Sequence, residues 1–332
     1  MYAFIVNPAA GHGKGKRVFL RISNSKLYSQ LDCRYFYTDA AGDAERIASE
    51  LCTIKNTNLQ VIIVIGGDGT INEVINGIGS KSIPLAFIPG ASGNDFARGT
   101  RITGSPLEIF EKIVSDTEGG ACPYWSGTYS LDLQDERLFV NSIGFGFDAQ
   151  VVRQANKSAA KKLFNFFRVG KLSYVFALLN VLIHFKPFQV KVVADDKRYI
   201  IDRCFMVTVT NHPYYGGGMR IIPNAAIQPD RMSLLLIHSI SKWKVLALFL
   251  TVFWGGHRNF KEVNIIEASQ IEISVSKQNM CQIDGDAVYF SRCSLSKNAT
   301  PISMIGNSRK AQAVEVIMEK IEGKASVTGK ET

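Results

Sequence analysis

The stretch VIIVIGGDGTINEVINGI, residues 61–78, decides the fold of the first part of this chain. Its opening residues, Val61 to Ile65, form an unbroken β-branched run, the pattern of a parallel strand covered on both faces. The glycine-rich turn that follows exposes backbone N–H groups beside the positive end of a helix dipole, so it suits a phosphate chain. One apolar stripe of that helix is predicted from the i, i+3, i+4, i+7 spacing of Ile71, Val74, Ile75 and Ile78.

Asp68 lies inside this turn, where a carboxylate would repel a phosphate chain. The residue therefore needs a reason to be there. It could bind a metal ion, or it could take a proton from an acceptor hydroxyl. It could also serve only as a cap of the helix, in a turn without a ligand.

Two further glycine-rich loops follow apolar runs that suit buried strands. Residues 89–98, PGASGNDFAR, follow Leu85 to Ile88, and residues 7–16, NPAAGHGKGK, follow Ala3 to Val6. The loop at 7–16 matches neither the Walker A pattern nor G-x-G-x-x-G, so it is a weak signal by itself. In an open parallel sheet, however, adjacent loops at the carboxyl ends of strands share one crevice. Three such loops therefore indicate a nucleotide site.

The hydrophobic periodicity changes once along the chain, which predicts two domains. A chain of 332 residues also exceeds the size that one core normally supports. Residues 1–123 alternate between strand and helix patterns at doubly wound spacing, whereas later residues alternate between apolar and polar, as in a β-sandwich. The first domain's predicted strands are 3–6, 33–37, 61–65 and 85–88, with helices near 14–23, 43–52, 72–78 and 106–115. The sandwich strands are predicted at 128–133, 137–142, 190–193, 198–201, 205–210, 233–238, 270–275 and 280–283.

The cysteines and the start of the chain bear on its compartment. Six cysteines show neither C-x-x-C spacing nor the density of a disulfide scaffold, which predicts reduced, mostly buried thiols in a cytosol. The chain starts directly in a strand pattern, without a charged and apolar leader, which argues against secretion. The histidines show no H-x-x-x-H spacing and predict no metal ligand.

Together these motifs resemble the diacylglycerol kinase catalytic-domain family, in particular its bacterial lipid kinases and sphingosine kinases. The GGDGT loop alone would also fit NAD kinases, but Asn72-Glu73 after it and the Asn94-Asp95 pair favour the lipid kinases. The likeness covers about residues 1–305. The residues that carry it are Asn7-Pro8, Gly11, Gly66 to Thr70, Asn72-Glu73, Ser92 to Arg98, Asn211, Tyr215 to Met219, Pro223-Asn224 and Ile283 to Asp286.

The resemblance implies an α/β plus all-β fold. Residues 1–123 would form a three-layer α/β nucleotide domain, and residues 124–305 would form a β-sandwich domain that holds the lipid acceptor. The active site would lie in the cleft. The last residues, 306–332, would pack back on the first domain as a helix near 308–322 and end in a polar tail.

The resemblance also implies an activity, an ATP- and Mg²⁺-dependent lipid kinase. Phosphoryl transfer requires a held nucleotide, neutralised charge and an acceptor oxygen placed in line. Asp284 would be the general base, and Asp68 would lie close to the phosphates and the metal ion. The carboxylates that would hold a magnesium and water network are Asp132, Asp230 and Asp286. ATP contacts are expected from Asn7, Thr38, Gly67, Gly69, Thr70, Ser92, Gly93 and Asn94.

Some residues depart from the family pattern or stay open. Ala10 stands where serine is usual, and Ala91-Ser92 replaces the usual Gly-Thr while keeping a hydroxyl. Arg231 stands where glycine is expected, which puts the metal role of Asp230 in doubt. Asp95 could contact the nucleotide or cap the next helix, and we favour the cap.

Nearly all of the net charge of +9 lies in one segment, residues 149–194. This segment has no acidic residue and carries +8, interleaved with Phe164, Phe166 and Phe167. Its apolar run, residues 172–185, is too short to span a bilayer of ~30 Å. The segment could approach an anionic membrane surface, or it could be a core helix with a solvated basic edge.

These observations predict a kinase that phosphorylates the hydroxyl of a membrane lipid, most readily diacylglycerol or a relative. It would be cytoplasmic and attached peripherally to the inner face of the membrane. Two alternatives are a soluble NAD kinase and a catalytically weak lipid- or nucleotide-binding regulator. No recognised module supports nucleic-acid binding. The oligomeric state, a homodimer included, stays open.

Overall fold

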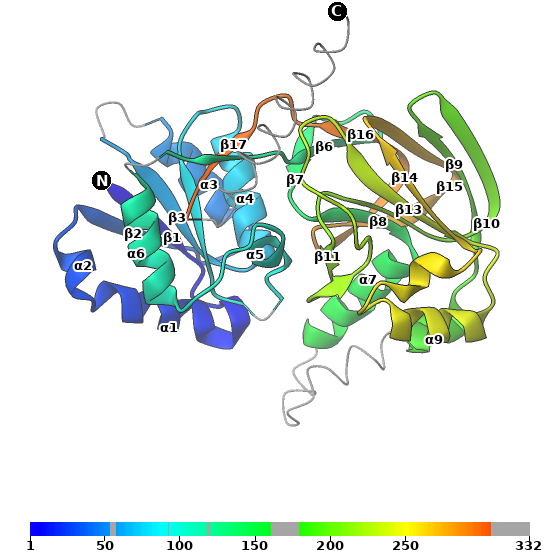
Figure 1. The fold of residues 1–332 in the computed structure, drawn as a ribbon, viewed down its shortest axis with the longest axis horizontal. Coiled ribbons are helices and arrows are strands. Elements are labelled where there is room, and N and C mark those ends of the chain that lie inside the picture. The colour runs from blue at the N-terminus through cyan, green and yellow to red at the C-terminus, as the bar shows by residue number, and fades with distance from the viewer. Residues whose placement is uncertain (54–57, 92, 118–119, 161–178, 307–332) are drawn as a thin grey trace, which may run out of the picture. The chain divides into compact units, whose positions relative to one another are not determined.

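The computed structural model describes residues 1–53, 58–91, 93–117, 120–160 and 179–306. In the helix at 147–160, it describes side chains up to residue 156. The chain divides into two compact units (Figure 1): Met1–Tyr124 together with the segment from Ile302 onward, and Trp125–Pro301. The predicted helix at 308–322 and residues 161–178 of the basic segment lie outside the described residues.

The first unit is an α/β domain built on a six-stranded sheet of order β2-β1-β3-β4-β17-β5. The four predicted strands are confirmed as consecutive parallel neighbours. The three-layer α/β fold is confirmed as well. Its strands are β1 (Tyr2–Val6), β2 (Cys33–Tyr37), β3 (Val61–Gly66), β4 (Leu85–Pro89), β5 (Cys122–Tyr124) and β17 (Ile302–Ile305). Its helices are α1 (Ala10–Ser23), α2 (Lys26–Ser29), α3 (Asp43–Leu51), α4 (Asp68–Ile78), α5 (Asp95–Gly99) and α6 (Pro106–Thr117).

The strand order reverses at β1, because the chain passes from β1 outward to β2 and then back across β1 to β3 and β4. Right-handed crossovers therefore place α1 on one face of the sheet and α3 and α4 on the other. The contacts agree, since α1 packs with α6 and α3 packs with α4. Ligands of such sheets bind where the strand order reverses, so the loops after β1 and β3 frame the expected crevice.

Strand β17 corrects the predicted domain boundary. Residues 302–305 were assigned to the sandwich, but they pair in parallel with β4 and antiparallel with β5. Met304, for example, lies opposite both Leu85 and Cys122. A short apolar run does not record which sheet it joins, because that choice depends on partners far away in the sequence.

The second unit is the predicted β-sandwich and also contains helices; the sequence analysis left a helix open only within residues 149–194. Its sheet has the order β14-β13-β10-β8-β15-β16-β6-β7, and β9 pairs with both β10 and β15. Its strands are β6 (Gly127–Leu131), β7 (Arg137–Phe139), β8 (Ser142–Gly146), β9 (Phe188–Ala194), β10 (Lys197–Thr210), β11 (Tyr214–Tyr215), β12 (Met219–Arg220), β13 (Met232–His238), β14 (Val263–Ala268), β15 (Gln270–Ile283) and β16 (Asp286–Lys297). Its helical segments are α7 (Phe147–Ala160), α9 (Lys242–Thr251) and η2 (Gly256–Asn259).

Two long strands explain several differences from the predicted strands. Strand β10 joins the predicted strands 198–201 and 205–210, and β15 joins 270–275 and 280–283. Each continues through a register shift, where the apolar alternation is interrupted. Strands β8, β11, β12, β14 and β16 were not predicted.

The second unit has two hydrophobic cores. One lies inside the sandwich and includes Phe145 against Phe290, with ring centroids 4.8 Å apart. The other lies beneath α7 and α9 and includes Phe147 stacked on Phe205 at 4.6 Å. Within the described ranges, no helix is both long enough and apolar enough to cross a bilayer.

Candidate functional site

Three loops meet at the carboxyl edge of the first unit's sheet. Asn7, after β1, donates from Nδ2 to Thr70 Oγ1 on α4 at 3.1 Å. Its Oδ1 accepts from the backbone N–H groups of Ala9 and Ala10, both at 3.1 Å. Gly11 has a φ of 57°, and a β-carbon there would lie 2.6 Å from the carbonyl oxygen of Gly90. Because of these contacts, the first loop rests on both others.

Asp68 joins the second and third loops. Its Oδ2 accepts from the backbone N–H of Asp95 at 2.9 Å, and its Oδ1 accepts from that of Phe96 at 3.0 Å. The carboxylate therefore caps the start of α5 from another segment of the chain. This geometry gives Asp68 a positioning role between two of the predicted ATP-binding loops.

Asp95 is not the cap of α5 that we favoured from the sequence. It is the first residue of the helix, and its Oδ1 pairs with Arg98 Nη1 at 2.9 Å. Asp68 instead accepts hydrogen bonds from the backbone N–H groups at the start of α5. No local sequence pattern could indicate this contact.

Asn94 has the left-handed conformation, with a φ of 50°, and stands directly before α5. Its Nδ2 donates to the carbonyl of Ala91 at 2.7 Å. Its Oδ1 is buried and has no hydrogen-bond donor among the described residues. A ligand N–H or O–H would satisfy this oxygen. Ser92, the other polar side chain predicted here, lies outside the described residues.

The start of α4 offers backbone donors. Gly67 precedes the helix in an extended conformation and supplies no side-chain cap. The first-turn N–H groups, which include those of Gly69 and Thr70, therefore lack a side-chain partner at the cap position and can receive an anion. Thr38 is buried at the end of β2, where its backbone N–H donates to Val6 at 3.0 Å. Gly93 lies beside the carboxylate of Asp68.

In the second unit, Asp284 occupies the turn between β15 and β16. Asp284 and Gly285 both have positive φ, 48° and 100°, and they connect the paired residues Ile283 and Asp286. This is the two-residue hairpin turn that an Asp-Gly pair favours. The formation of this turn alone would therefore explain the Asp-Gly pair in the motif that was predicted to be catalytic.

The carboxylate of Asp284 accepts hydrogen bonds from three backbone N–H groups. Its Oδ2 accepts from Val140 at 2.7 Å, and its Oδ1 accepts from Asn141 and Ser142 at 2.7 and 2.9 Å. A general base needs an oxygen turned toward the acceptor hydroxyl. Here both oxygens hold the 140–142 segment, so the geometry supports a positioning role, and the predicted base role stays a prediction.

Further polar side chains surround the same segment. Asn211, one of the residues that carry the family resemblance, is buried and donates to the carbonyls of Phe139 and Val140 at 3.3 and 3.1 Å. Lys297 donates to Asn211 Oδ1 at 2.8 Å, and His212 Nε2 lies 2.8 Å from Asn141 Oδ1.

The three carboxylates predicted to hold Mg²⁺ do not form one ligand set. In the described part of the chain, no group of three His, Cys, Asp or Glu side chains is placed to share an ion. Asp132 Oδ1 instead accepts from the backbone of Ser291 and Arg292, at 2.9 and 2.7 Å. Asp230 lies exposed before β13. Desolvation raises the pKa of Asp286, which opens β16.

Asp148 is a buried acid that the sequence analysis missed. It lies in the first turn of α7, where Tyr215 donates its hydroxyl to Oδ2 at 3.0 Å and Ala149 N–H donates to Oδ1 at 2.9 Å. Burial raises the pKa of Asp148 to about 7, because the charged form is desolvated. The carboxyl borders an apolar pocket of about 60 Å³, lined also by Phe147, Met206 and Leu248. Perturbed acids of this kind are enriched at functional sites.

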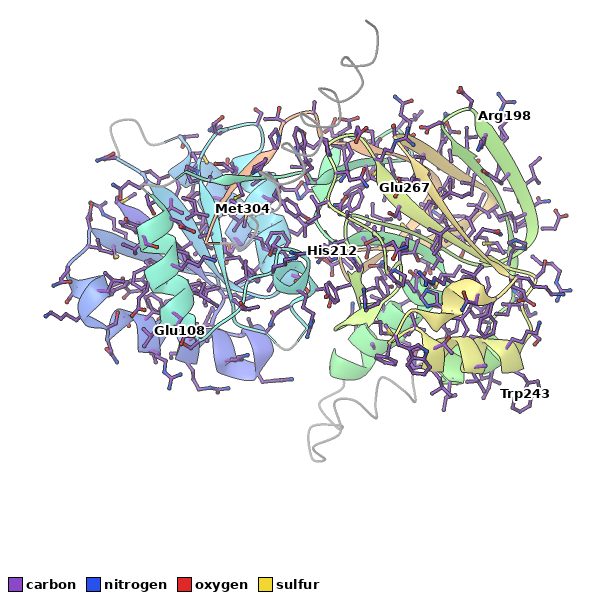
Figure 2. All side chains as sticks on the ribbon, viewed as in Figure 1. Glu108, Arg198, His212, Trp243, Glu267 and Met304 are labelled. Atoms are coloured by element: carbon purple, nitrogen blue, oxygen red, sulfur yellow. The ribbon has the colours of Figure 1, made fainter. Side chains whose placement is uncertain are left out.

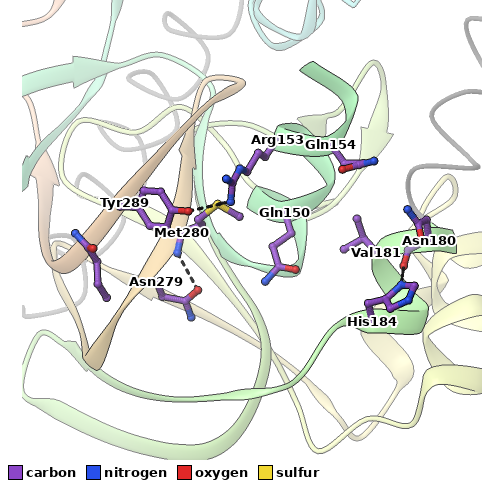
Figure 3. Close-up of a pocket in the computed structure, with 10 residues that line it drawn as sticks. Gln150, Arg153, Gln154, Asn180, Val181, His184, Asn279, Met280 and Tyr289 are labelled. Atoms are coloured by element: carbon purple, nitrogen blue, oxygen red, sulfur yellow. Dashed lines mark hydrogen bonds between the residues drawn. The ribbon is translucent and has the colours of Figure 1, made fainter. Parts of the chain in front are cut away.

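The other side of α7 borders a polar pocket of about 590 Å³ (Figure 3). Arg153 donates to the Tyr289 hydroxyl at 2.9 Å, and its guanidinium lies 5.6 Å from the centre of that ring. Asn156 donates to the carbonyl of Gly285 at 3.3 Å. Helix α7 therefore braces the hairpin that carries Asp284. The remaining polar lining is Gln150, Gln154, Asn180, His184, Gln278 and Asn279.

Comparison with known proteins gives matches over both units. The diacylglycerol kinase catalytic domain matches residues 1–120, and the YegS C-terminal NAD kinase beta sandwich-like domain matches residues 141–303. "Putative lipid kinase YtlR" of Bacillus subtilis (strain 168) is 30% identical over 303 residues, 90% of this chain and 97% of that protein. A diacylglycerol kinase of Mycobacterium tuberculosis (strain ATCC 25618 / H37Rv) is 27% identical over 85% of this chain and 87% of its own. A crystal structure of a diacylglycerol kinase from Bacillus anthracis str. Sterne shares the fold, with a TM-score of 0.66 at 20% identity, and the match covers 92% of this chain and 97% of that chain.

Proposed function

Because this chain belongs to the diacylglycerol kinase catalytic-domain family, we propose that it transfers the γ-phosphoryl group of ATP to the hydroxyl of a membrane lipid. The family was predicted from the loop motifs and is confirmed. Diacylglycerol or a related lipid is the acceptor in this proposal. Residues 1–120 match the kinase model, so kinase chemistry is assigned to the first unit.

The observation that carries the nucleotide part is the joining of three strand-end loops. Asn7 bonds to Thr70, Asp68 bonds to the start of α5, and Gly11 packs on Gly90. This network holds the open start of α4 and the unsatisfied Oδ1 of Asn94 at the same edge of the sheet. An ATP molecule supplies both complements, since its phosphates accept from backbone N–H groups and its base or ribose carries donors.

In this proposal, the second unit positions the lipid acceptor. Asp284 accepts from the backbone N–H groups of residues 140–142, and Asn211 donates to the carbonyls of residues 139 and 140. A reaction of this kind depends mostly on positioning and electrostatics, since little covalent chemistry falls to the protein. In this proposal, an ordered backbone at residues 139–142 therefore contributes to transfer even where no side chain takes the proton of the acceptor hydroxyl.

Magnesium enters this proposal with the nucleotide, as Mg–ATP, and not as a resident ion. Mg²⁺ usually keeps several waters and is bound through one or two carboxylates plus substrate phosphates. In the described part of the chain, Asp132, Asp230 and Asp286 belong to no group of three His, Cys, Asp or Glu side chains that could share an ion, which supports this view.

We also propose that the chain works in the cytoplasm and attaches peripherally to an anionic membrane. The +8 charge of residues 149–194 supports attachment, because each cation near an anionic surface contributes about 1 kcal/mol. Arg153, however, is occupied by Tyr289, so the charge that faces a membrane would come from the other cations.

The test is transfer from γ-labelled ATP to a panel of acceptors. Diacylglycerol, monoacylglycerol, ceramide, sphingosine and NAD are incubated separately with the full chain and Mg²⁺, and products are separated by chromatography. Labelled diacylglycerol or a relative would support the proposal. Labelled NAD alone would favour the soluble dinucleotide kinase, and binding of ATP without any product would favour a regulator.

A further inference from the structure

Helix α9 is apolar around nearly its whole circumference. Between its opening lysines and its end it reads VLALFLT, and residues 232–261 contain no acidic residue. Its inner face is buried, with Val245 and Leu248 in the core beneath it. A helix that is apolar on all sides is normally enclosed by protein or by lipid. One side of α9 is enclosed by the second unit, and its outer side needs an occupant.

The outer side of α9 presents large apolar side chains to solvent. Trp243 is 82% exposed, Leu250 is 64% exposed and Trp254, just after the helix, is 67% exposed. Trp243 and Leu250 are seven residues apart and so share one helix face. Figure 2 shows Trp243 at the periphery of the second unit. We call Trp243, Leu250, Phe253 and Trp254 the α9 face.

A neighbouring helix extends this surface. Lys242 donates from Nζ to the carbonyl of Ile183, which places helical residues 179–184 beside the start of α9. The side chain of Ile183 is 65% exposed. Two separate segments of the chain therefore expose apolar side chains next to one another, which scattered surface residues would not do.

We propose that the α9 face docks into the surface of a lipid bilayer. Two exposed tryptophans suit the interface, where an amphipathic ring meets both lipid and water. The cations around the face are Lys242, Lys244, Arg258 and Lys261, and the carboxylate of Glu262 is paired with Lys244 at 2.6 Å. This charge is complementary to anionic headgroups and repels a second copy of the same face. At ten residues, about 15 Å, α9 lies on a bilayer and cannot span it.

Docking by α9 would bring the bilayer within one helix of Asp148. The inner face of the helix covers the apolar pocket that Asp148 borders, so one helix separates the bilayer from that pocket. The pocket holds about 60 Å³, well below the ~300–1,000 Å³ of small-molecule sites. Acyl chains therefore stay in the bilayer while the headgroup is presented to the protein. This last step rests on the proposed kinase activity, whereas docking rests only on the proposed membrane attachment, for which it names the surface.

The test measures vesicle binding without ATP or diacylglycerol. The full chain and its Trp243→Ser/Trp254→Ser variant are sedimented with phosphatidylglycerol–phosphatidylcholine vesicles and with phosphatidylcholine vesicles. The matched control is Ile200→Ser, which removes a side chain that is 71% exposed on β10. Ile200 is two residues from Arg198, which Figure 2 shows at the opposite end of the second unit from Trp243. Circular dichroism checks the fold of each variant.

The double variant should bind anionic vesicles about 100-fold more weakly, because each buried indole contributes roughly tenfold or more. The Ile200→Ser control should bind like the parent. Vesicle binding should shift the parent's tryptophan emission to the blue, and brominated acyl chains should quench that emission. Unchanged vesicle binding by the folded double variant would overturn docking. A parent dimer that the double variant breaks, with vesicle binding intact, would instead make this face an interface between copies. Kinase activity on a dispersed short-chain acceptor reports on the proposed function separately.

Discussion

Replacing Asp284 by asparagine separates an anchoring carboxylate from a general base. The parent carboxylate uses both oxygens, with one bond from Val140 and two from Asn141 and Ser142. Asparagine keeps one accepting oxygen and turns an amino group toward a backbone N–H. The substitution therefore removes the charge, breaks at least one bond and leaves a backbone donor unpaired.

The expected loss follows from these bonds. A hydrogen bond to a charged group contributes about 1.5–3 kcal/mol, and an unpaired buried donor costs about 1–3 kcal/mol. We expect the free energy of unfolding of Asp284→Asn to fall by about 2–4 kcal/mol. Asp195 gives a matched control, because it has a similar φ of 50° but accepts from Ser269 and Gln270, both at 3.0 Å, through Oδ1 alone. Asp195→Asn keeps both bonds and should lose less than about 1 kcal/mol.

Urea unfolding followed by circular dichroism measures the two variants, and turnover is measured where both are fully folded. Equal unfolding free energies for Asp284→Asn and Asp195→Asn would contradict the anchoring geometry. Anchoring also orders residues 140–142, so turnover of Asp284→Asn should fall as well. A general base would in addition change the pH profile of kcat, whereas loss of positioning alone would lower kcat at every pH.

Three further predictions follow from the described contacts. Asp68→Asn should weaken ATP binding measured by calorimetry and lower turnover by ~10²-fold or more, since it loosens two loops at once; unchanged affinity and kcat would contradict this. Asp148→Asn removes an acid whose pKa is raised from 3.8 to about 7, so the parent loses stability from this group as pH rises from about 4 to 7. In urea titrations, the free energy of unfolding of the variant should rise relative to that of the parent by up to about 4 kcal/mol across that range. A difference that stays constant with pH would refute this prediction. A chelator should abolish turnover but leave the Tm of the nucleotide-free chain unchanged, and a lowered Tm would reveal a resident metal ion.

The first unit could be predicted well because its signals are local. Continuous β-branched runs such as Val61 to Ile65 and glycine-rich loops identify strands and turns without knowledge of their partners. Strand β17 could not be assigned, because four residues of apolar sequence carry no information on which of two sheets they join. The regular part of α1 begins at residue 14, as predicted, because Gly11, His12 and Gly13 have left-handed conformations.

The sequence indicated which loops form the candidate site, but it did not indicate the hydrogen bonds between them. Sequence position placed Asn7, Asp68 and Asn94 in neighbouring loops, and the structure brings those loops together. It could not show that Asp68 caps α5, because the two segments are 27 residues apart. Asp284 was predicted to be catalytic, yet the Asp-Gly pair at 284–285 is also a hairpin signal that could have been weighed.

Asp148 and α9 were missed for a different reason. The burial of Asp148 depends on Gly144, where a β-carbon would overlap its carboxyl, and on the hydroxyl of Tyr215 far along the chain. Helix α9 interrupts a region of strand patterns, and its apolar sequence has no strong one-sided periodicity. A capping serine, Ser241, precedes it and accepts from Lys244 N–H at 3.4 Å, which is the local signal that could have revealed the helix.

The central claim is that this chain moves the γ-phosphoryl group of ATP to a lipid hydroxyl. The direct measurement is the radioactivity extracted into organic solvent after incubation of the full chain with Mg²⁺, diacylglycerol vesicles and either γ- or α-labelled ATP. We predict a labelled lipid phosphomonoester from γ-labelled ATP only, and none when diacylglycerol is replaced by its hydroxyl-blocked ether. Absence of extractable label with every lipid tested, while NAD becomes labelled, would contradict the account.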